Sequence, residues 1–290
     1  MIVLNKKTND FEYHINGKMI RRSKNRSKLE QTVIGLGYKL DQVTATHNIG
    51  EVIVKKSEFT VSERFEFITQ FTKLAAKGVI PGLVITGDGG LGKTHTVLET
   101  MHSLKLKEDT IGTVDGDFVF IKGYSTPRNL YTSLYHNNGK IIIFDDCDSS
   151  FKDPIGANIF KAALDSYAKR IISWGAESKD DSVPSRFEFT GKVIFISNLT
   201  LDKFPQAILS RSMLVDLTLN QEEKLDRIED VFMNETHYEK EDKMEVLAFI
   251  KKNVAKAKDL NIRSAFNIIK IKMAIGEGWE KPALYNFMVN

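Results

Sequence analysis

The sequence predicts an α/β fold in which a parallel sheet lies between two layers of helices (an αβα sandwich), with a small N-terminal α+β module and a C-terminal helical lid. Three observations predict this arrangement. Short, continuously apolar segments recur at residues 83–86, 118–121, 141–144 and 193–197, as is typical of parallel strands covered on both faces. Segments with helical spacing alternate with these strands. After residue 219 only helical patterns remain.

The bulk composition is that of an ordinary globular protein. The chain has 290 residues, of which 42% are hydrophobic and 27% charged, and its net charge of +3 does not by itself indicate a nucleic-acid partner. The single cysteine, Cys147, excludes an intrachain disulfide and suits a reducing compartment. No apolar run has the length of a membrane span or a signal peptide, and the histidines lack the spacing of zinc ligands. We therefore expect an intracellular, cytoplasmic protein.

Residues 1–48 are expected to form the separate N-terminal module. Asn16 and Gly17 both tolerate positive φ, so they favour a tight turn between two strands. The expected elements are a β-hairpin, a short helix and a final strand, at residues 10–22, 24–36 and 37–40.

The main domain is expected at residues 49–219. Thr60 and Glu63 form a capping-box pattern that predicts a helix start. Apolar residues at helical spacing follow it: Phe65, Ile68, Phe71 and Leu74. A second helix is predicted between the third and fourth strands, with its core positions at Ile155, Ile159, Phe160, Ala163 and Leu164.

Residues 220–290 are expected to form the lid. Asn220 and Glu223 can cap its first helix. Three helices are predicted from the apolar positions Leu225, Ile228 and Phe232, then Val246, Leu247 and Ile250, then Phe266, Ile269 and Met273.

A glycine-rich motif follows the first predicted strand of the main domain. It fits G-x-x-x-x-G-K-[ST], the P-loop, and a helix-forming run at residues 96–101 comes after it. Backbone N–H groups of such a loop surround a phosphate, and the helix N-terminus adds positive potential. Lys93 should reach the β- and γ-phosphates, and the Thr94 hydroxyl should bind Mg²⁺. We expect a P-loop NTPase that binds ATP and Mg²⁺ through Gly87, Asp88, Gly89, Gly90, Leu91, Gly92, Lys93, Thr94 and His95.

Two acids end the third apolar strand. In a P-loop enzyme Asp145 is placed to hold the Mg²⁺ shell. Asp146 is placed to orient or deprotonate the attacking water. A strand that merely ends in a polar turn is the alternative, which the P-loop upstream disfavours.

Three further polar residues are candidates for the same chemistry. Asn198 ends the fourth apolar strand and could position the water, although asparagine is also common in turns. Arg211 could reach the γ-phosphate of a neighbouring subunit, or could be a surface arginine. Arg263 starts the third lid helix, where it could contact the γ-phosphate or be a solvated charge.

The order of these motifs resembles the AAA+ ATPases over residues 49–275. The resemblance implies a ring or spiral of subunits, with Asn198 as sensor 1, Arg211 as the arginine finger and Arg263 as sensor 2. The run Leu-Ser-Arg-Ser around Arg211 is similar to the Ser-Arg-Cys element of clamp loaders, with Ser212 in place of cysteine.

One departure concerns the acidic pair. Most AAA+ enzymes have Asp-Glu there, so the shorter Asp146 implies slow or partner-dependent hydrolysis. An Asp-Asp pair also occurs in superfamily 3 viral helicases, whose middle motif resembles residues 163–174. In those helicases the motif carries basic residues that touch DNA, here Lys169 and Arg170. The helix that carries Arg263 instead favours a standard AAA+ lid, so the chain resembles the intermediate ATPases of phages and mobile elements.

Three segments are candidates for contact with a substrate. Tyr124 follows a strand, where it could stack on a base, grip a peptide or simply pack. Residues 169–179, with Trp174, could form a hairpin that faces nucleic acid, although buried packing also suits a tryptophan. A basic run without acids could contact phosphates or be a solvated face: Lys18, Arg21, Arg22, Lys24, Arg26 and Lys28.

The leading hypothesis is therefore an oligomeric ATPase, plausibly a hexameric ring encoded by a phage or mobile element, that remodels or moves along nucleic acid. A helicase, a helicase loader or a replication accessory factor would fit. The alternative is a remodeller of polypeptides or protein complexes, with Tyr124 as the peptide grip. A small-molecule kinase is a third possibility that leaves the lid and the Ser-Arg element without a role.

Overall fold

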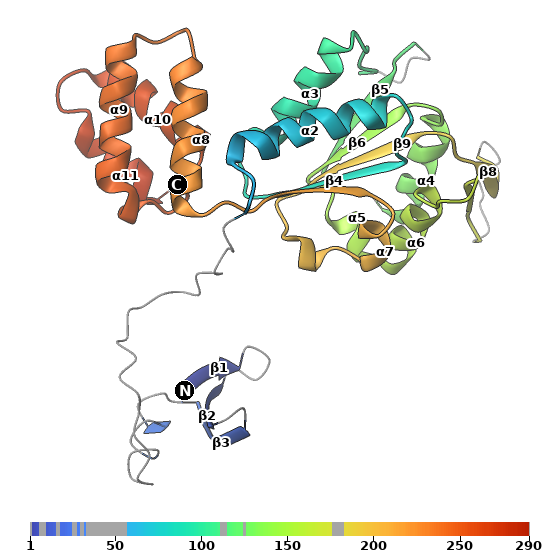
Figure 1. Cartoon of the computed structure of the whole chain (residues 1–290), viewed down its shortest axis with the longest axis horizontal. Coiled ribbons are helices and arrows are strands. Elements are labelled where there is room, and N and C mark those ends of the chain that lie inside the picture. Colours follow the sequence, from blue (N-terminus) through green and yellow to red (C-terminus); the bar gives the residue numbers. More distant parts are fainter. Residues whose placement is uncertain are drawn as a thin grey trace. The chain divides into compact units, whose positions relative to one another are not determined.

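The computed structural model describes residues 2–5, 10–15, 18–24, 28–29, 32, 57–110, 115–123, 126–175 and 183–289. Its contacts divide the chain into two compact units, residues 1–53 and 54–290 (Figure 1). The second unit holds both the sheet domain and the C-terminal helices. The boundaries proposed at residues 48 and 219 remain predictions.

The N-terminal unit contains a three-stranded antiparallel sheet. Its strands are β1 (Ile2–Asn5), β2 (Asp10–Ile15) and β3 (Lys18–Ser23), in the order β1-β2-β3. Ile15 pairs with Lys18, as expected for the hairpin predicted there. Strand β1 was not predicted. The strand expected at residues 37–40 and most of the helix expected at residues 24–36 lie outside the described residues.

A five-stranded parallel sheet forms the centre of the second unit. Its order is β10-β4-β9-β6-β5, and every pair is parallel. The strands are β4 (Gly82–Gly87), β5 (Phe118–Lys122), β6 (Ile141–Asp145), β9 (Lys192–Ile196) and β10 (Met213–Leu217). Four of them were predicted. The exception is β10, an edge strand with three exposed residues, so it lacks the continuous apolar run of a buried strand.

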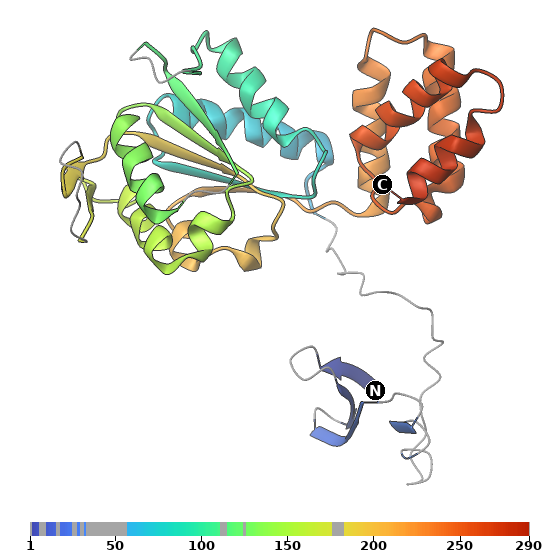
Figure 2. The same ribbon diagram turned by 180° about the vertical axis from the view of Figure 1, so that it is seen from behind.

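Helices cover both faces of this sheet (Figures 1 and 2). Leu83 and Ile85 of β4 pack in one core with α2 (Val61–Ala76) and α3 (Lys93–Ser103). Val84 points to the other face, because side chains alternate along a strand. That second core is completed by α4 (Pro127–His136), α5 (Ser149–Lys152), α6 (Pro154–Ala163) and α7 (Gln206–Leu209). The αβα fold class predicted from the sequence is confirmed.

The predicted core positions hold with two exceptions. Ile155 lies in the first turn of α6 and is 54% exposed, whereas Ile159 and Phe160 are buried. Met273, near the end of its helix, is 57% exposed. Both were wrong as core residues because helical spacing alone does not show where the packed face ends.

The C-terminal helices form their own apolar core (Figure 2). Asn220 and Glu223 make the predicted capping box at the start of the first of them. The helices are α8 (Gln221–Asn234), α9 (Lys240–Asn253), α10 (Ile262–Ile275) and α11 (Glu280–Val289), and the last was not predicted. Two short 3₁₀ turns, η1 (Leu201–Lys203) and η2 (Val254–Lys256), lie in the unit. In the described part of the chain no helix is long and apolar enough to cross a membrane.

Candidate nucleotide-binding site

The glycine-rich motif connects the interior strand β4 to α3, as its sequence predicted. Gly87 has φ +123°, and a Cβ there would lie 2.4 Å from the carbonyl of Leu217 at the end of β10. Gly92 has φ +97° and is the residue before α3 begins. Both positions therefore require glycine, the first because another strand passes close by and both because of the left-handed backbone.

Lys93 is buried, and its ammonium group is fully engaged. Its Nζ donates to the carbonyl oxygens of Gly87 and Asp88, both at 2.7 Å, and to Oδ1 of Asn198 at 3.0 Å. Burial lowers the pKa of Lys93 to about 8, and the charge of Asp146 opposes this shift most strongly. A phosphate would replace these neutral acceptors with charged oxygens, which bind an ammonium group more strongly.

Thr94 and Asp145 meet at the start of α3 and the end of β6. The Thr94 hydroxyl lies 3.2 Å from each carboxylate oxygen of Asp145. Burial, and then the charge of Asp146, raise the pKa of Asp145. Hydroxyl and carboxylate oxygens are the hard donors that Mg²⁺ prefers, and Mg²⁺ commonly takes only one or two protein ligands beside substrate phosphates. The donor set therefore fits Mg²⁺.

Asp146 and Asn198 are brought together at the adjacent ends of β6 and β9. Asn198 Nδ2 donates to Asp146 Oδ1 at 2.7 Å. Asp146 has φ +54°, in the left-handed region, and its backbone N–H donates to the carbonyl of Ile196 at 3.1 Å. Asn198 thus bridges Lys93 and Asp146, and the carboxylate of Asp146 stays exposed.

The lid contacts the glycine-rich loop directly, which sequence reasoning missed. The N–H of Ile262 donates to the carbonyl of Gly90 at 3.1 Å. A Cβ at Gly90, whose φ is +72°, would lie 2.9 Å from Cγ of Asn261. The C-terminal helices therefore contact the loop at Gly90, where the P-loop motif allows any residue. The motif could not have predicted this contact.

Two cations of α8 reinforce the same contact. Arg227 Nε lies 3.4 Å from the carbonyl of Leu91, and its guanidinium lies 3.7 Å from the ring centroid of Phe65. Lys224 Nζ pairs with Asp88 at 2.8 Å. A lysine and an arginine three positions apart lie on one helix face, and this spacing was the signal available in the sequence.

A cavity of about 890 Å³ lies at this site, and its wall comes from the sheet domain and the C-terminal helices. Arg263 also lines it, and its charge contributes to the lowered pKa of Lys93. The structure therefore gathers most of the predicted site residues: Lys93, Thr94, Asp145, Asp146, Asn198 and Arg263.

One curated protein was found to be similar in sequence. It is an uncharacterized 36.7 kDa protein of the nrdC-mobD intergenic region of Enterobacteria phage T4, 28% identical over 244 residues, which are 77% of this chain and 73% of that protein. No family model matches the chain.

Two solved structures share a general likeness. The E. coli MS115-1 HORMA:CdnC:Trip13 complex has a chain with TM-score 0.45 and 12% identity, covering 77% of this chain and 87% of that one. The Drosophila ORC bound to DNA has a chain with TM-score 0.47 and 13% identity, covering 91% and 74%. Likeness at these levels says nothing about what this chain does.

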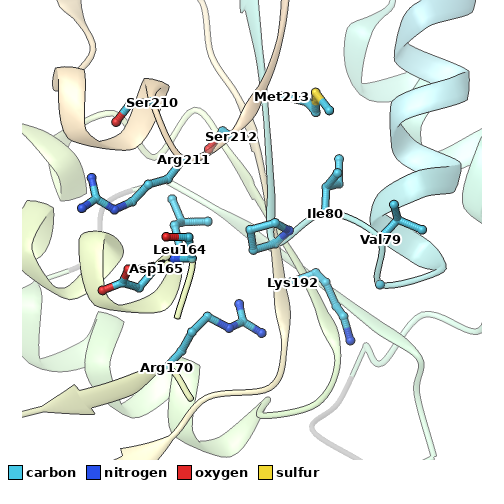
Figure 3. A pocket seen from close by; sticks show the side chains of 13 residues that line it. Val79, Ile80, Leu164, Asp165, Arg170, Lys192, Ser210, Arg211, Ser212 and Met213 are labelled. Carbon is cyan, nitrogen blue, oxygen red and sulfur yellow. Dashed lines mark hydrogen bonds between the residues drawn. The ribbon is translucent and has the colours of Figure 1, made fainter. Parts of the chain in front are cut away.

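Arg211 is the one predicted catalytic residue that does not line the cavity. Arg211, labelled in Figure 3, precedes β10 at the amino ends of the strands. The glycine-rich loop lies at their carboxyl ends. Its Nη1 donates to the carbonyl of Ala207 at 3.0 Å. Arg211 therefore has no route to the nucleotide cavity of its own subunit.

The candidate substrate contacts are only partly described. Tyr124 lies outside the described residues. Arg170 donates to the carbonyls of Ala163 and Gly191, at 2.7 and 2.8 Å, so its guanidinium supports the fold. Trp174 is half-buried at the end of β7 (Ile171–Ser173), which pairs with β8 (Arg186–Glu188), and its ring lies 5.7 Å from that of Tyr131.

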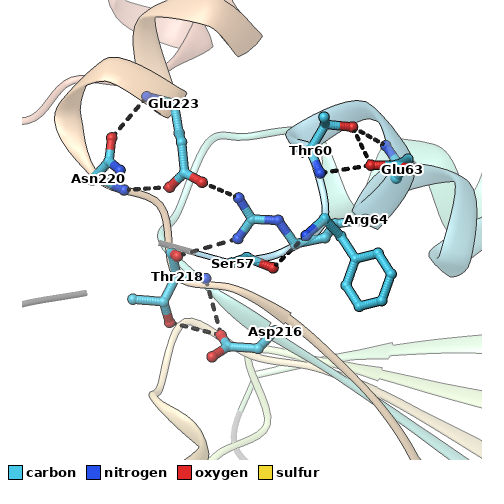
Figure 4. A network of polar contacts seen from close by, with 9 residues as sticks. Ser57, Thr60, Glu63, Arg64, Asp216, Thr218, Asn220 and Glu223 are labelled. Carbon is cyan, nitrogen blue, oxygen red and sulfur yellow. Dashed lines mark hydrogen bonds and ion pairs between the residues drawn. The ribbon is translucent and has the colours of Figure 1, made fainter. Parts of the chain in front are cut away.

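A buried ion pair joins the sheet domain to the first lid helix (Figure 4). Arg64 of α2 lies 2.5 Å from Glu223 of α8, with side chains only 8% and 12% exposed. Glu223 also accepts from the N–H of Asn220 at 2.9 Å. The same carboxylate thus caps α8 and holds it against α2.

Proposed function

We propose that this chain is an ATP-hydrolysing enzyme of the AAA+ type that remodels or moves along nucleic acid. The observation that carries the proposal is the convergence of the Lys93 ammonium, the Thr94–Asp145 pair and the Asp146–Asn198 pair in one cavity. A loop for phosphates, oxygen donors for Mg²⁺ and a carboxylate for a water molecule are the parts that phosphoryl transfer to water needs.

In this proposal Lys93 holds the β- and γ-phosphates. Its donors now satisfy loop carbonyls and Asn198, so phosphate binding exchanges hydrogen bonds inside a preformed cradle. Thr94 and Asp145 would hold Mg²⁺, which neutralises charge on the phosphates when bound. The attraction between the Lys93 ammonium and a phosphate would be stronger at this buried position than in water, because the local dielectric constant is low.

Asp146 orients the attacking water and takes up its proton. Its exposed carboxylate faces the same cavity as Lys93 and Thr94. Asn198, which now donates to that carboxylate, would position the water from the other side. A positioned base of this kind typically contributes a factor of about 10² to 10⁴ in rate.

The proposal includes assembly into a ring or spiral. Arg263 acts on the phosphates from the lid of the same subunit, since it lines the cavity. Arg211 lies at the amino ends of the strands, opposite the glycine-rich loop, so it acts on the nucleotide of a neighbouring copy. An arginine supplied in this way stabilises the charge of the transition state.

A basic N-terminal segment supports nucleic acid as the substrate. It has no acids between its first and last cation, and Arg22, Lys24 and Lys28 are exposed. Lysine and arginine side chains grouped on one segment supply the sequence-independent part of nucleic-acid affinity.

The first experiment is steady-state ATP hydrolysis alone, with single-stranded DNA and with duplex DNA. The Lys93→Ala variant supplies the blank. A triple charge reversal of Arg22, Lys24 and Lys28 should remove the stimulation, whereas reversal of the exposed Lys281 in the lid should not. A rate indifferent to both DNAs would reject the nucleic-acid part of the proposal and direct the search to protein partners.

A further inference from the structure

A second cavity, of about 750 Å³, lies at the amino ends of the strands, away from the nucleotide cavity (Figure 3). Its wall comes from the segment before β4, the turn after α6, the start of β9 and the segment before β10. Figure 3 shows Arg211 and Asp165 on one side of the hollow and Lys192 with Ile80 on the other.

Positive charge dominates this cavity. Arg170, Lys192 and Arg211 line it together with one acid, Asp165. In the part of the chain that is described, none of the three cations has an ion-pair partner. Asp165 accepts instead from the N–H of Ser166 at 2.8 Å.

The three cations differ in how far their donors are used. Both terminal nitrogens of Arg170 donate to backbone carbonyls, so the guanidinium is held in place. Arg211 donates from Nη1 to a carbonyl of α7, and its guanidinium has further N–H groups that can donate to a ligand. No hydrogen bond of the Lys192 ammonium is seen within the described ranges. Its Nζ lies near Gly78, where an added Cβ would be 3.5 Å away.

A buried hydroxyl in the same wall also lacks a partner. Ser212 Oγ is inaccessible and makes no hydrogen bond among the described residues. The space for it exists because residue 82 is glycine: a Cβ there would lie 2.8 Å from Ser212 Oγ and 2.5 Å from Leu164. The wall thus offers an ammonium and guanidinium donors to a ligand, while the Ser212 hydroxyl lies buried behind it.

We propose that this cavity binds a phosphate group, with Lys192 and Arg211 as its charged ligands and Arg170 as a fixed positive neighbour. Guanidinium and ammonium donors around a hollow are the chemistry that recognises phosphate oxygens. The phosphate belongs to a free ligand, whereas contact of Arg211 with the nucleotide of a neighbouring copy is already part of the proposed function. Binding of a free phosphate here does not depend on ATP hydrolysis, so it can hold even where the proposed function fails.

The first arm of the test uses free pyrophosphate and calorimetry. All proteins carry Lys93→Ala, so that the glycine-rich loop is disabled. Adding Lys192→Gln should raise the dissociation constant at least tenfold, whereas adding Lys203→Gln, at an exposed lysine outside the cavity, should leave it unchanged. Adding Lys192→Arg should keep most of the affinity, and matching melting curves would show that the variants fold.

The second arm tests a phosphate supplied by another copy. Wild-type protein loaded with a non-hydrolysable ATP analogue is mixed with Lys93→Ala protein, and association is followed by sedimentation velocity. Lys192→Gln in the Lys93→Ala partner should weaken association about tenfold, and Lys203→Gln should not. A tenfold loss in the first arm supports the site. If Lys192→Gln matches Lys203→Gln in the first arm, the proposal is overturned, and a loss confined to the second arm assigns Lys192 to the contact between copies.

Discussion

The side-chain amide of Asn198 lies 2.7 Å from the carboxylate of Asp146, although the residues are 52 positions apart. The other end of the same amide accepts from Lys93 at 3.0 Å. One asparagine therefore connects the group proposed to hold phosphates with the group proposed to activate water. Displacing Lys93 toward a phosphate would change the hydrogen bonding of Asp146.

Asp146→Asn should retain ATP but hydrolyse it at least about 100-fold more slowly, because the amide cannot accept the water's proton. Equilibrium binding of a fluorescent ATP analogue and steady-state hydrolysis would be measured on one preparation. Asp202→Asn, at an exposed acid in η1, serves as the control with normal turnover. Turnover above a tenth of wild type would show that Asp146 is not the base.

The affinity for ATP should fall at alkaline pH. The pKa of Lys93 is about 8 in the ligand-free protein, and phosphates favour the charged form, so binding requires the proton. The dissociation constant should be flat below about pH 7 and rise up to about tenfold per pH unit above pH 8. A titration series over pH 6.5 to 9.5 measures this. Lys93→Ala should show weak, pH-independent binding; a slope in that variant would assign the effect to another group.

Arg211→Ala should abolish hydrolysis while nucleotide binding persists. Mixed with Lys93→Ala, it should recover part of the activity, because some interfaces then combine an intact nucleotide cavity with an intact arginine. The matched control mixes Lys93→Ala with Asp146→Asn, whose defects lie in the same cavity and cannot complement each other. If neither mixture recovers ATP hydrolysis, Arg211 does not act on the nucleotide of a neighbouring copy.

Gly90→Ala should destabilise the ligand-free protein by about 2 kcal/mol, because alanine is strained at φ +72° and its Cβ would meet Asn261. Chemical denaturation gives the free energy of unfolding. Gly89→Ala is the matched control: the nearest atom to its Cβ would be Asn198 Oδ1, at an ordinary 3.6 Å. Equal losses in the two variants would mean that seating of the lid does not explain Gly90.

Arg64→Ala should cost about 3 kcal/mol of unfolding free energy, because it leaves the carboxylate of Glu223 buried without its partner. The exposed Gln70 lies on the same helix, and Gln70→Ala should change stability by less than about 0.5 kcal/mol. Denaturant unfolding of both variants decides the matter. A loss below about 1 kcal/mol for Arg64→Ala would show that the pair contributes little.

The site residues that could be predicted from the sequence are those that a short, contiguous sequence pattern identifies. Thr94 belongs to a contiguous motif, and Asp145 and Asn198 each end an apolar strand. Parallel strands bring their carboxyl ends to one edge, so the strand-end residues meet without any further information. The capping boxes at Thr60 and Asn220 were predictable for the same reason.

The residues that were missed act over long distances in sequence. Arg227 and Leu91 are 136 positions apart. The spacing of Lys224 and Arg227 places both cations on one face of α8, but it does not show which segment they contact. Ile262 reaches Gly90 through its backbone N–H, a group that every residue but proline carries, so this contact depends on how the C-terminal helices pack. Strand β10 was missed because an edge strand need not be apolar on both faces.

The edge strand β10 also determines how mechanical load would travel through the molecule. It pairs in parallel with β4 from Met213 to Leu217, and the lid begins only four residues later, at Gln221. Tension on the lid would therefore enter the sheet along the strand axis and load the rungs of the β10–β4 ladder together, in shear. A chain built this way would transmit force between its C-terminal helices and its glycine-rich loop through a stiff connection, whereas a strand peeled from the edge would lose its hydrogen bonds one at a time.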